Sequence, residues 1–478
     1  MSLGRRKQER QAEFWIATHD LAGGPGHVFY DRLNTLLDEA GFDRFVEGLC
    51  EPYYEETGRG SIPPGRYFRM LLVGYFEGID SQRGIAWRCC DSLSLRRFLF
   101  LELNEASPDH SSLTNTRNRL PAELFEQVFA FVLNLARVKK LLTDGPLTVG
   151  VDATTLEANA AMKAILRKDT GEDWKAYLKR LMLAEGLITQ DDRPTDEDLR
   201  KFDKSRGKQG KKKVSNDEWE SPSDPDSRII KMKDGRTHLG YKAEHVVDLD
   251  SDLILSATVH HGTDGDAETL LPSLAQAQEN LVSSGSAATI QDVAADKGYH
   301  ANQTLVDCTA AQVRTYIPER DIGERTWTDK SWEDEQAFRG NRRRVRGKKG
   351  RRLQRLRSER VERSFAHVCE TGGARRTWLR GLETINKRYL IQAAARNLGV
   401  VMRKLFGVGT PRSLQGLDVE AWLAEWLAEW LAEWLARWGT WAFSPSLGKL
   451  PELLGGQLVT LARSLPTFRP PPPKLAAV

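Results

Sequence analysis

The stretch LTVGVDATT, residues 147–155, decides the fold of the larger part of this chain. Leu147, Val149 and Val151 alternate with other residues, which is the period-two pattern of a β-strand, and this strand runs into Asp152. The residues before this stretch follow helical spacing instead. The chain therefore changes here from a helical region to a region that contains a sheet.

Downstream of this strand, the pattern alternates between strands and helices. Strands are predicted at His238–Asp248, Leu253–His260, Thr289–Ala295 and Gln312–Ile317, and helices at 272–281, 302–311, 351–369 and 385–405. The first two of these strands are joined by a turn, Asp248–Asp252, and read as a hairpin. This order predicts an α/β domain with a mixed sheet. A charged stretch at about 165–227 interrupts it, and its composition suggests an insertion or mobile loop.

Upstream, residues 10–140 are predicted to be mostly helical, because apolar residues recur at helical spacing in segments such as 66–76 (RYFRMLLVGYF). The expected N-terminal caps of the short helices are Ser81, Ser94 and either Asp109 or Ser111. The helix after the last cap carries Arg117 and Arg119. Short helices with a basic last one suit a helix-turn-helix module, and a plain helical bundle is the alternative.

Three domains follow from these patterns: a helical domain at 1–143, a mixed-sheet domain at 144–410 and a low-complexity tail at 411–478. In the tail, residues 421–438 repeat AEWL with period four, and a Pro-rich segment, RPPPPKLAAV, ends the chain. The repeat places its Trp residues in a row along a helix, which suits binding to a partner helix. We favour the alternative that the repeat is a duplicated tract with no dedicated role.

The net charge of the 478 residues is only +4, yet it is unevenly distributed. Residues 200–213 carry a net charge of +7 and residues 339–363 a net charge of +11, so the rest of the chain is acidic. Such local concentrations of positive charge usually bind a polyanion. The five cysteines form no CxxC pair, and we find neither a signal peptide nor a membrane span, which indicates a cytoplasmic protein with reduced thiols.

Three acids could carry chemistry. Asp152 and Asp296 are each predicted at the end of a strand, and Glu362 lies on a helix beside an apolar edge formed by Val361 and Phe365. Clustered carboxylates repel one another, and Mg²⁺, which prefers carboxylate and phosphate oxygens, removes that cost. Each acid also has a purely structural interpretation: a turn for Asp152, a helix cap for Asp296, and a solvated helix position for Glu362.

With these residues in view, the chain resembles DDE-type transposases of bacterial insertion sequences over about residues 15–412. The strings that carry the resemblance are 67–99, 108–120, 151–161 (VDATTLEANAA), 224–248, 295–300 (ADKGYH) and 362–405. Many relatives carry a tyrosine and an arginine before the glutamate and a lysine after it at set spacing. Here the positions four before and seven after Glu362 are Ser358 and Cys369.

The resemblance implies a helical, helix-turn-helix-like N-terminal domain and an RNase H-like catalytic domain. Asp152, Asp296 and Glu362 would be the catalytic and metal-binding triad, holding two Mg²⁺ ions, with Mn²⁺ as a substitute. The implied activity is cleavage at the terminal inverted repeats of the element followed by strand transfer into target DNA. Double-stranded DNA would be the partner, the assembly a homodimer on DNA, and the location the bacterial cytoplasm at the nucleoid.

Basic residues near the triad and in the N-terminal domain are predicted to contact DNA. They are Arg117, Arg119, Arg342, Arg343, Arg344, Arg346, Lys348, Lys349, Arg351, Arg352, Arg357 and Arg363. Contacts of this kind with backbone phosphates are independent of sequence and sensitive to salt. Two alternatives stay open: a catalytically inactive DNA-binding relative, and an RNase H-like nuclease without strand transfer.

Overall fold

The structure is a computed structural model that describes residues 27–55, 57, 60–208, 216–232, 235–320, 326–328 and 330–414. The chain divides into two compact units, residues 1–412 and 413–478. The AEWL repeat and the Pro-rich segment lie outside the described residues. The fold reported below is that of the first unit, and the domain boundary expected within it, at 143/144, stays a prediction.

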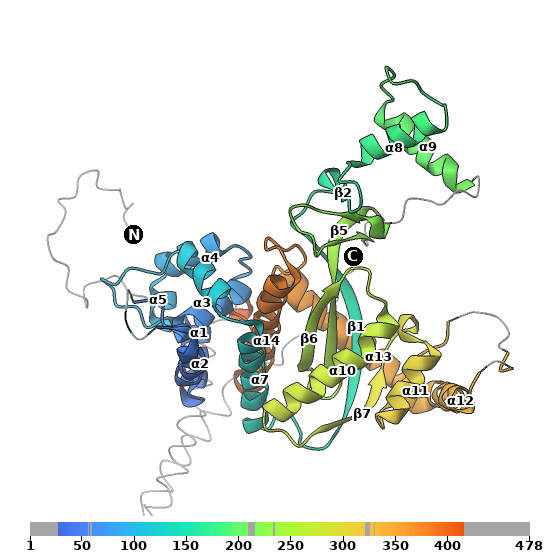
Figure 1. The fold of residues 1–478 in the computed structure, drawn as a ribbon. Coiled ribbons are helices and arrows are strands. Elements are labelled where there is room, and N and C mark those ends of the chain that lie inside the picture. The colour runs from blue at the N-terminus through green and yellow to red at the C-terminus, as the bar shows by residue number, and fades with distance from the viewer. Residues whose placement is uncertain are drawn as a thin grey trace, which may run out of the picture. The chain divides into compact units, whose positions relative to one another are not determined.

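The N-terminal region is helical, as predicted, and its helices are drawn in blue to cyan in Figure 1. They are α1 (Val28–Glu39), α2 (Phe42–Cys50), α3 (Pro64–Glu77), α4 (Gln82–Asp91), α5 (Leu93–Phe98), α6 (His110–Arg119) and α7 (Ala122–Val138). The capping residues of α4 and α6 are Ser81 and Asp109, because their side chains accept the N–H groups of Gly84 at 3.1 Å and Ser112 at 2.8 Å. The cap expected at Ser94 is wrong. Ser92 caps α5 instead, because this helix begins at Leu93. Leu95 and Phe98 are among its buried residues.

A mixed sheet forms the second part. Its strands are β1 (Pro146–Glu157), β4 (Arg228–Lys231), β5 (Thr237–Asp248), β6 (Ile254–His261), β7 (Thr289–Ala294) and β8 (Arg314–Tyr316). The order is β4-β5-β1-β7-β8, with β6 also paired to β5. Strand β5 is antiparallel to β1 and β6, whereas β7 is parallel to both β1 and β8. This is the RNase H-like mixed sheet that was predicted, and the β5–β6 hairpin turns at Asp248–Asp252 as expected.

Helices pack on both faces of this sheet (Figure 1). They are α10 (Asp266–Ser283), α11 (Asn302–Ala310), α12 (Trp332–Arg346), α13 (Lys348–Phe365) and α14 (Leu382–Phe406). Glu244 and His245 are neighbours on β5, so their side chains point to opposite faces. Thr269 of α10 bonds to Glu244, and Ser364 of α13 bonds to His245. Helices α10 and α13 therefore cover opposite faces.

Three predictions about elements need correction. Strand β1 does not end at Asp152 but continues to Glu157, because β5 pairs with it along this whole length. The basic run contains a helix that was not predicted, α12, before α13 begins. Helix α13 ends at Phe365 and is followed by a π-helical turn, Ala366–Thr371, so the helix predicted at 351–369 is too long at its C-terminal end.

The charged insertion is more ordered than its composition suggested. It contains α8 (Trp174–Ala184), α9 (Asp196–Lys208) and a small sheet of β2 (Leu166–Arg167) and β3 (Trp219–Glu220). The two helices share a small apolar core made of Leu178, Met182, Leu199 and Phe202. The packing of four apolar residues at helical spacing thus supports two helices here despite the high charge. Residues 209–215 lie outside the described part. No helix among the described residues is long and apolar enough to cross a membrane.

Candidate active site

The pairing of β1 with β7 brings two of the three predicted acids together. The parallel register aligns Val149 with Val293 and Gly150 with Ala294. Asp152 and Asp296 each lie two residues beyond the last pair, so they sit side by side where β7 ends. The negative charge of Asp296 accordingly contributes to raising the pKa of Asp152. The arrangement is that of an open α/β sheet, whose ligands bind at the carboxyl ends of parallel strands.

Asp152 is a half-buried carboxylate with a cationic partner. Its Oδ2 accepts a hydrogen bond from Arg357 Nη1 at 2.5 Å, and its Oδ1 accepts the backbone N–H of Ala153 at 2.8 Å. Burial raises the pKa of Asp152 above its usual value, whereas Arg357 and the Ala153 N–H oppose this and Asp296 adds to it. A cation at this position would relieve both the burial and the repulsion from Asp296.

Asp296 occupies a turn that its own side chain holds. Its Oδ1 accepts the N–H of Gly298 at 2.7 Å and so caps the short 3₁₀ turn Lys297–Tyr299. The capping role that was considered for Asp296 is therefore present. Gly298 also lies against a further acid, because a β-carbon there would be 2.5 Å from Asp266 Oδ2 and 2.8 Å from Asp296 Oδ1. The two carboxylates thus flank one glycine.

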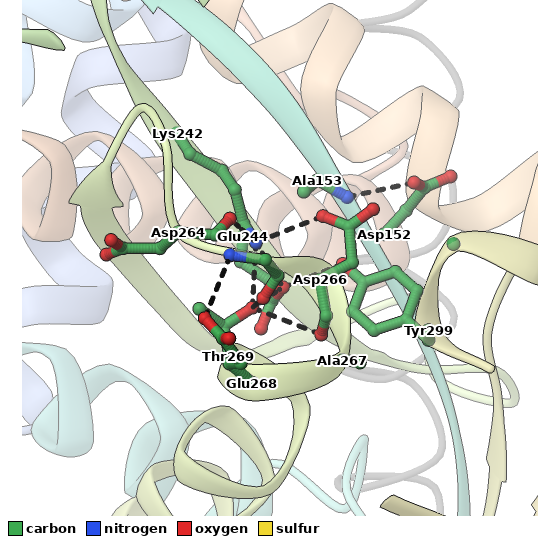
Figure 2. Close-up of polar contacts among 12 residues, drawn as sticks. Asp152, Ala153, Lys242, Glu244, Asp264, Asp266, Ala267, Glu268, Thr269 and Tyr299 are labelled. Carbon is green, nitrogen blue, oxygen red and sulfur yellow. Dashed lines mark hydrogen bonds and ion pairs between the residues drawn. The ribbon is translucent and has the colours of Figure 1, made fainter. Parts of the chain in front are cut away.

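Asp266 belongs to a largely buried polar network with Lys242, Glu244, Thr269 and Tyr299 (Figure 2). Lys242 Nζ donates to Asp266 Oδ1 at 3.0 Å and to Thr269 Oγ1 at 2.8 Å. Thr269 and Tyr299 in turn donate to Oε2 of Glu244, at 2.8 and 2.7 Å. Glu244 is only 1% exposed, and its second oxygen has no hydrogen-bond partner among the described residues. The network ties the turn after β7 and the start of α10 to strand β5.

Sequence reasoning missed this network, although a signal was present. Lys242 and Glu244 stand two residues apart in HLGYKAEHVVD, so they share one face of a predicted strand. Buried charges in proteins are paired or bound to a ligand. Two opposite charges on the inner face of a predicted strand therefore pointed to a buried polar cluster.

The side chain of Glu362, the third predicted acid, has different surroundings from those of Asp152 and Asp296. It is an exposed residue of α13, and no hydrogen bond or ion pair of its side chain is found within the described ranges. Helix α13 itself packs on β1, because a β-carbon at Gly150 would be 3.0 Å from Val361 and 3.2 Å from Arg357. The helix that carries Glu362 thus covers the strand that carries Asp152.

The donor set suits a hard divalent cation. In the part of the chain that the structure describes, no three His, Cys, Asp or Glu side chains form a group that could hold a metal ion. Mg²⁺ does not require such a cage, because it commonly binds one or two carboxylates and completes its shell with waters and substrate phosphates. The adjacent carboxylates of Asp152 and Asp296 fit that mode of binding.

The ten predicted DNA contacts on α12 and α13 fall into two groups: five that pair with an acid or bond to Thr315, and five that are exposed and form no ion pair among the described residues. Four of them pair with acids of the chain itself: Arg342 with Glu319, Lys349 with Asp292, Arg357 with Asp152, and Arg363 with Glu359. Arg344 bonds to Thr315. Five are exposed and form no ion pair among the described residues: Arg343, Arg346, Lys348, Arg351 and Arg352. The side chains of this second group are available to contact DNA phosphates.

The two N-terminal arginines also differ from each other. Arg119 is exposed and its guanidinium lies 4.7 Å from the ring of Tyr54. Arg117 lines a cavity instead, with its Nε and Nη1 atoms buried. Cys369, which stands where many relatives have a lysine, is buried against Tyr389.

Two family models match the chain. Residues 19–119 match a model described as Transposase domain (DUF772), and residues 199–398 match one described as Transposase DDE domain. The first match covers most of the N-terminal helices, and the second includes Asp296 and Glu362, whereas Asp152 precedes it. No curated protein and no solved structure matches the chain.

Proposed function

Because the chain belongs to the DDE-type transposases of insertion sequences, we propose that it cuts DNA at the terminal inverted repeats of its element and joins the freed strand to target DNA. One observation carries the proposal: the β1–β7 register sets Asp152 beside Asp296 at the carboxyl end of β7. Two adjacent carboxylates on a rigid sheet are the feature that metal-dependent phosphodiester chemistry needs most.

Asp152 and Asp296 are the proposed metal ligands, and Glu362 is the proposed third. Two Mg²⁺ ions, with Mn²⁺ as a substitute, would activate the attacking oxygen and stabilise the leaving oxygen. The Gly298 N–H orients one oxygen of Asp296, and its other oxygen accepts no hydrogen bond within the described ranges. Arg357 favours the ionised form of Asp152, which a metal ligand must adopt.

Positive charge beside these acids would hold the DNA backbone. The exposed group, Arg343, Arg346, Lys348, Arg351 and Arg352, lies at the end of α12 and in the first turns of α13, on the helix that carries Glu362. The N-terminal helices, with the exposed Arg119, are the proposed binding site for the terminal repeats. The proposed assembly on DNA is a homodimer, with one subunit for each end.

The test is cleavage of a duplex that carries the element's end, in the presence of Mg²⁺ or Mn²⁺. Asp152→Asn, Asp296→Asn and Glu362→Gln should each reduce cleavage at least about a hundredfold and leave duplex binding intact. The matched control is Asp307→Asn, because Asp307 lies on α11 and, among the described residues, its side chain bonds only to Gln303. Wild-type cleavage in all three variants would refute the site.

The alternative is a relative that binds DNA without cutting it. Binding of the end duplex with no cleavage in either metal would support that alternative. A product that is hydrolysed but never joined to target DNA would instead identify a nuclease without strand transfer.

A further inference from the structure

A cavity of about 320 Å³ lies within the first unit, lined by residues of α3, α4, α6, α7 and α14. None of Asp152, Asp296 and Glu362 lines it, so it is separate from the proposed active site. Much of its wall is apolar, with side chains that include Leu71, Ile79, Ile85, Phe125 and Ile391. Pockets for small ligands typically have this character, with a few polar groups that fix the ligand's orientation.

Two of the polar side chains in this wall, Tyr67 and Arg117, hold donors that lack an acceptor. The hydroxyl of Tyr67 and the Nε and Nη1 atoms of Arg117 are buried and have no hydrogen-bond partner among the described residues. A buried donor without an acceptor costs free energy, and the cost is larger for a charged group. Three such atoms at one cavity therefore suit a ligand that supplies several acceptor oxygens.

A second guanidinium adds to the positive charge. Arg388 also lines the cavity, and its hydrogen bond to the carbonyl of Gly373 is long, at 3.4 Å. The pKa of Arg388 is lowered to about 10, mainly by burial; the charge of Asp80 opposes this lowering and the charge of Arg117 adds to it. The two guanidinium groups are thus close enough to repel each other.

The acid at the cavity does not balance both charges. Asp80 is the one carboxylate that the described part of the wall contains, and it already accepts a hydrogen bond from Trp378 Nε1. One carboxylate faces Arg117, Arg388 and Arg83, of which Arg83 is bonded to His110. The cavity therefore carries net positive charge inside apolar walls.

We propose that this cavity binds a phosphate attached to a planar apolar group, the chemistry of a nucleoside monophosphate. The guanidinium groups of Arg117 and Arg388 would bind the phosphate oxygens, since a planar guanidinium matches phosphate in a bidentate geometry. The Tyr67 hydroxyl would donate to a further oxygen, and the apolar wall would receive the base. The ligand has two possible sources, a free nucleotide and the 5′-phosphorylated end of a DNA strand.

The test follows thermal unfolding of the full chain with dAMP, inorganic phosphate and deoxyadenosine as probes. At about a hundredfold excess over its Kd, dAMP should raise the unfolding midpoint by about 3 °C. Phosphate should raise it less, because it leaves the apolar wall unfilled, and deoxyadenosine should not raise it. A single-stranded oligonucleotide with and without a 5′ phosphate separates the two sources, because only a strand-end site responds to that phosphate.

Two variants make the outcome decisive. Arg117→Met should raise the midpoint without ligand, since it removes a buried unpaired charge, and it should abolish the shift with dAMP or the phosphorylated strand. Arg388→Met should also lose the shift, which keeps the test valid if one variant folds poorly. Arg97→Met, at an exposed position of α5, is the matched control and should keep it.

The inference is overturned if neither dAMP nor the 5′ phosphate shifts the wild-type midpoint. It is equally overturned if the shift persists in both Arg117→Met and Arg388→Met, because the phosphate would then bind elsewhere. Asp152→Asn should show the full wild-type shift. Failure at the cavity is therefore distinguishable from failure of the proposed cleavage activity.

Discussion

At the scale of single residues, Arg357 sets the protonation of Asp152. Its guanidinium is 2.5 Å from a half-buried carboxylate whose pKa burial already raises. In Arg357→Gln the opposing charge is gone, so the pKa of Asp152 rises further. A proton then competes with metal up to higher pH, and the acidic limb of the cleavage rate should move to higher pH. Cleavage is measured at saturating DNA from pH 5 to 9.

The control for this prediction is Arg352→Gln, because Arg352 is exposed on the same helix and forms no ion pair among the described residues. It removes the same charge and weakens DNA binding without touching Asp152. Its pH profile should match the wild type. An unshifted acidic limb in Arg357→Gln would show that Asp152 does not limit the rate.

Gly298 is the residue that lets two carboxylates approach each other. A methyl group there would lie well inside van der Waals contact with both Asp266 Oδ2 and Asp296 Oδ1. We expect Gly298→Ala to cost about 1–3 kcal/mol of stability and to lower cleavage by more than the stability loss explains. Gly145→Ala is the matched control, because no atom lies within 4 Å of its added carbon. Equal effects of the two substitutions on cleavage, measured beside urea unfolding, would contradict this role for Gly298.

At the scale of elements, His245 joins strand β5 to α13 and α14. Its Nδ1 donates to Ser364 Oγ at 2.8 Å, since the Ser364 proton goes to the Val361 carbonyl, and Tyr389 donates to its Nε2 at 2.8 Å. Its ring also stacks on Phe365, with centroids 4.1 Å apart. Burial holds the pKa of His245 well below its usual value, so the folded protein keeps this imidazole neutral.

The sign of the resulting pH effect follows from linkage. The unfolded chain takes up a proton at His245 below about pH 6.5, whereas the folded chain does not, so stability falls as the pH drops below that value. In His245→Gln this contribution, about 1.4 kcal/mol per pH unit, should disappear. Urea unfolding at pH 7, 6 and 5 measures the slope. The pH dependence that remains in His245→Gln comes from His367 and His260, whose pKa values are also lowered. A slope equal to that of the wild type would contradict the role given to His245.

The short turn that carries Asp296 depends on a hydrogen bond from Tyr299 to Glu244. Tyr299→Phe removes this bond and leaves a buried carboxylate with fewer donors, so stability should fall by about 1–3 kcal/mol. If the turn positions Asp296, the Mg²⁺ concentration for half-maximal cleavage should also rise. Tyr316→Phe is the control, because Tyr316 is buried on β8 and its hydroxyl interacts with Lys349 rather than with Glu244 or Asp296 in the described part of the chain. A stability loss without a change in Mg²⁺ dependence would make Tyr299 purely structural.

The sequence predicts elements better than it predicts their contacts. Alternation in LTVGVDATT predicts β1, and the short apolar run in TIQDVAA predicts β7, because strands packed in a sheet show one of these two patterns. Nothing local predicts that Asp152 lies within β1, since the extra length comes from pairing with β5. The same limit explains why the network of Lys242 and Glu244 was missed: its partners come from α10 and the turn after β7, which are distant in sequence.

At the scale of the whole molecule, the charge of the basic run is divided between two tasks. Residues 339–363 carry a net charge of +11, but several of their guanidinium groups are already paired. Arg342 forms a bidentate bond with Glu319 at 2.6 and 2.7 Å, and Lys349 lies 2.6 Å from Asp292. These pairs fix α12 and α13 to the sheet. The charge that remains for DNA is therefore smaller than the count suggests.

Salt dependence of DNA binding can separate the two tasks. Each phosphate that a side chain neutralises adds about 0.9 to the slope of log K against log salt concentration. Arg351→Gln with Arg352→Gln removes two exposed, unpaired charges, so the slope should fall by up to about 2. Arg342→Gln removes a charge already neutralised by Glu319, so it should destabilise the fold but leave the slope almost unchanged. Fluorescence anisotropy with an end duplex between 50 and 300 mM salt measures the slope for each variant. Equal slopes for the two variants would show that Arg342 leaves Glu319 and binds a DNA phosphate.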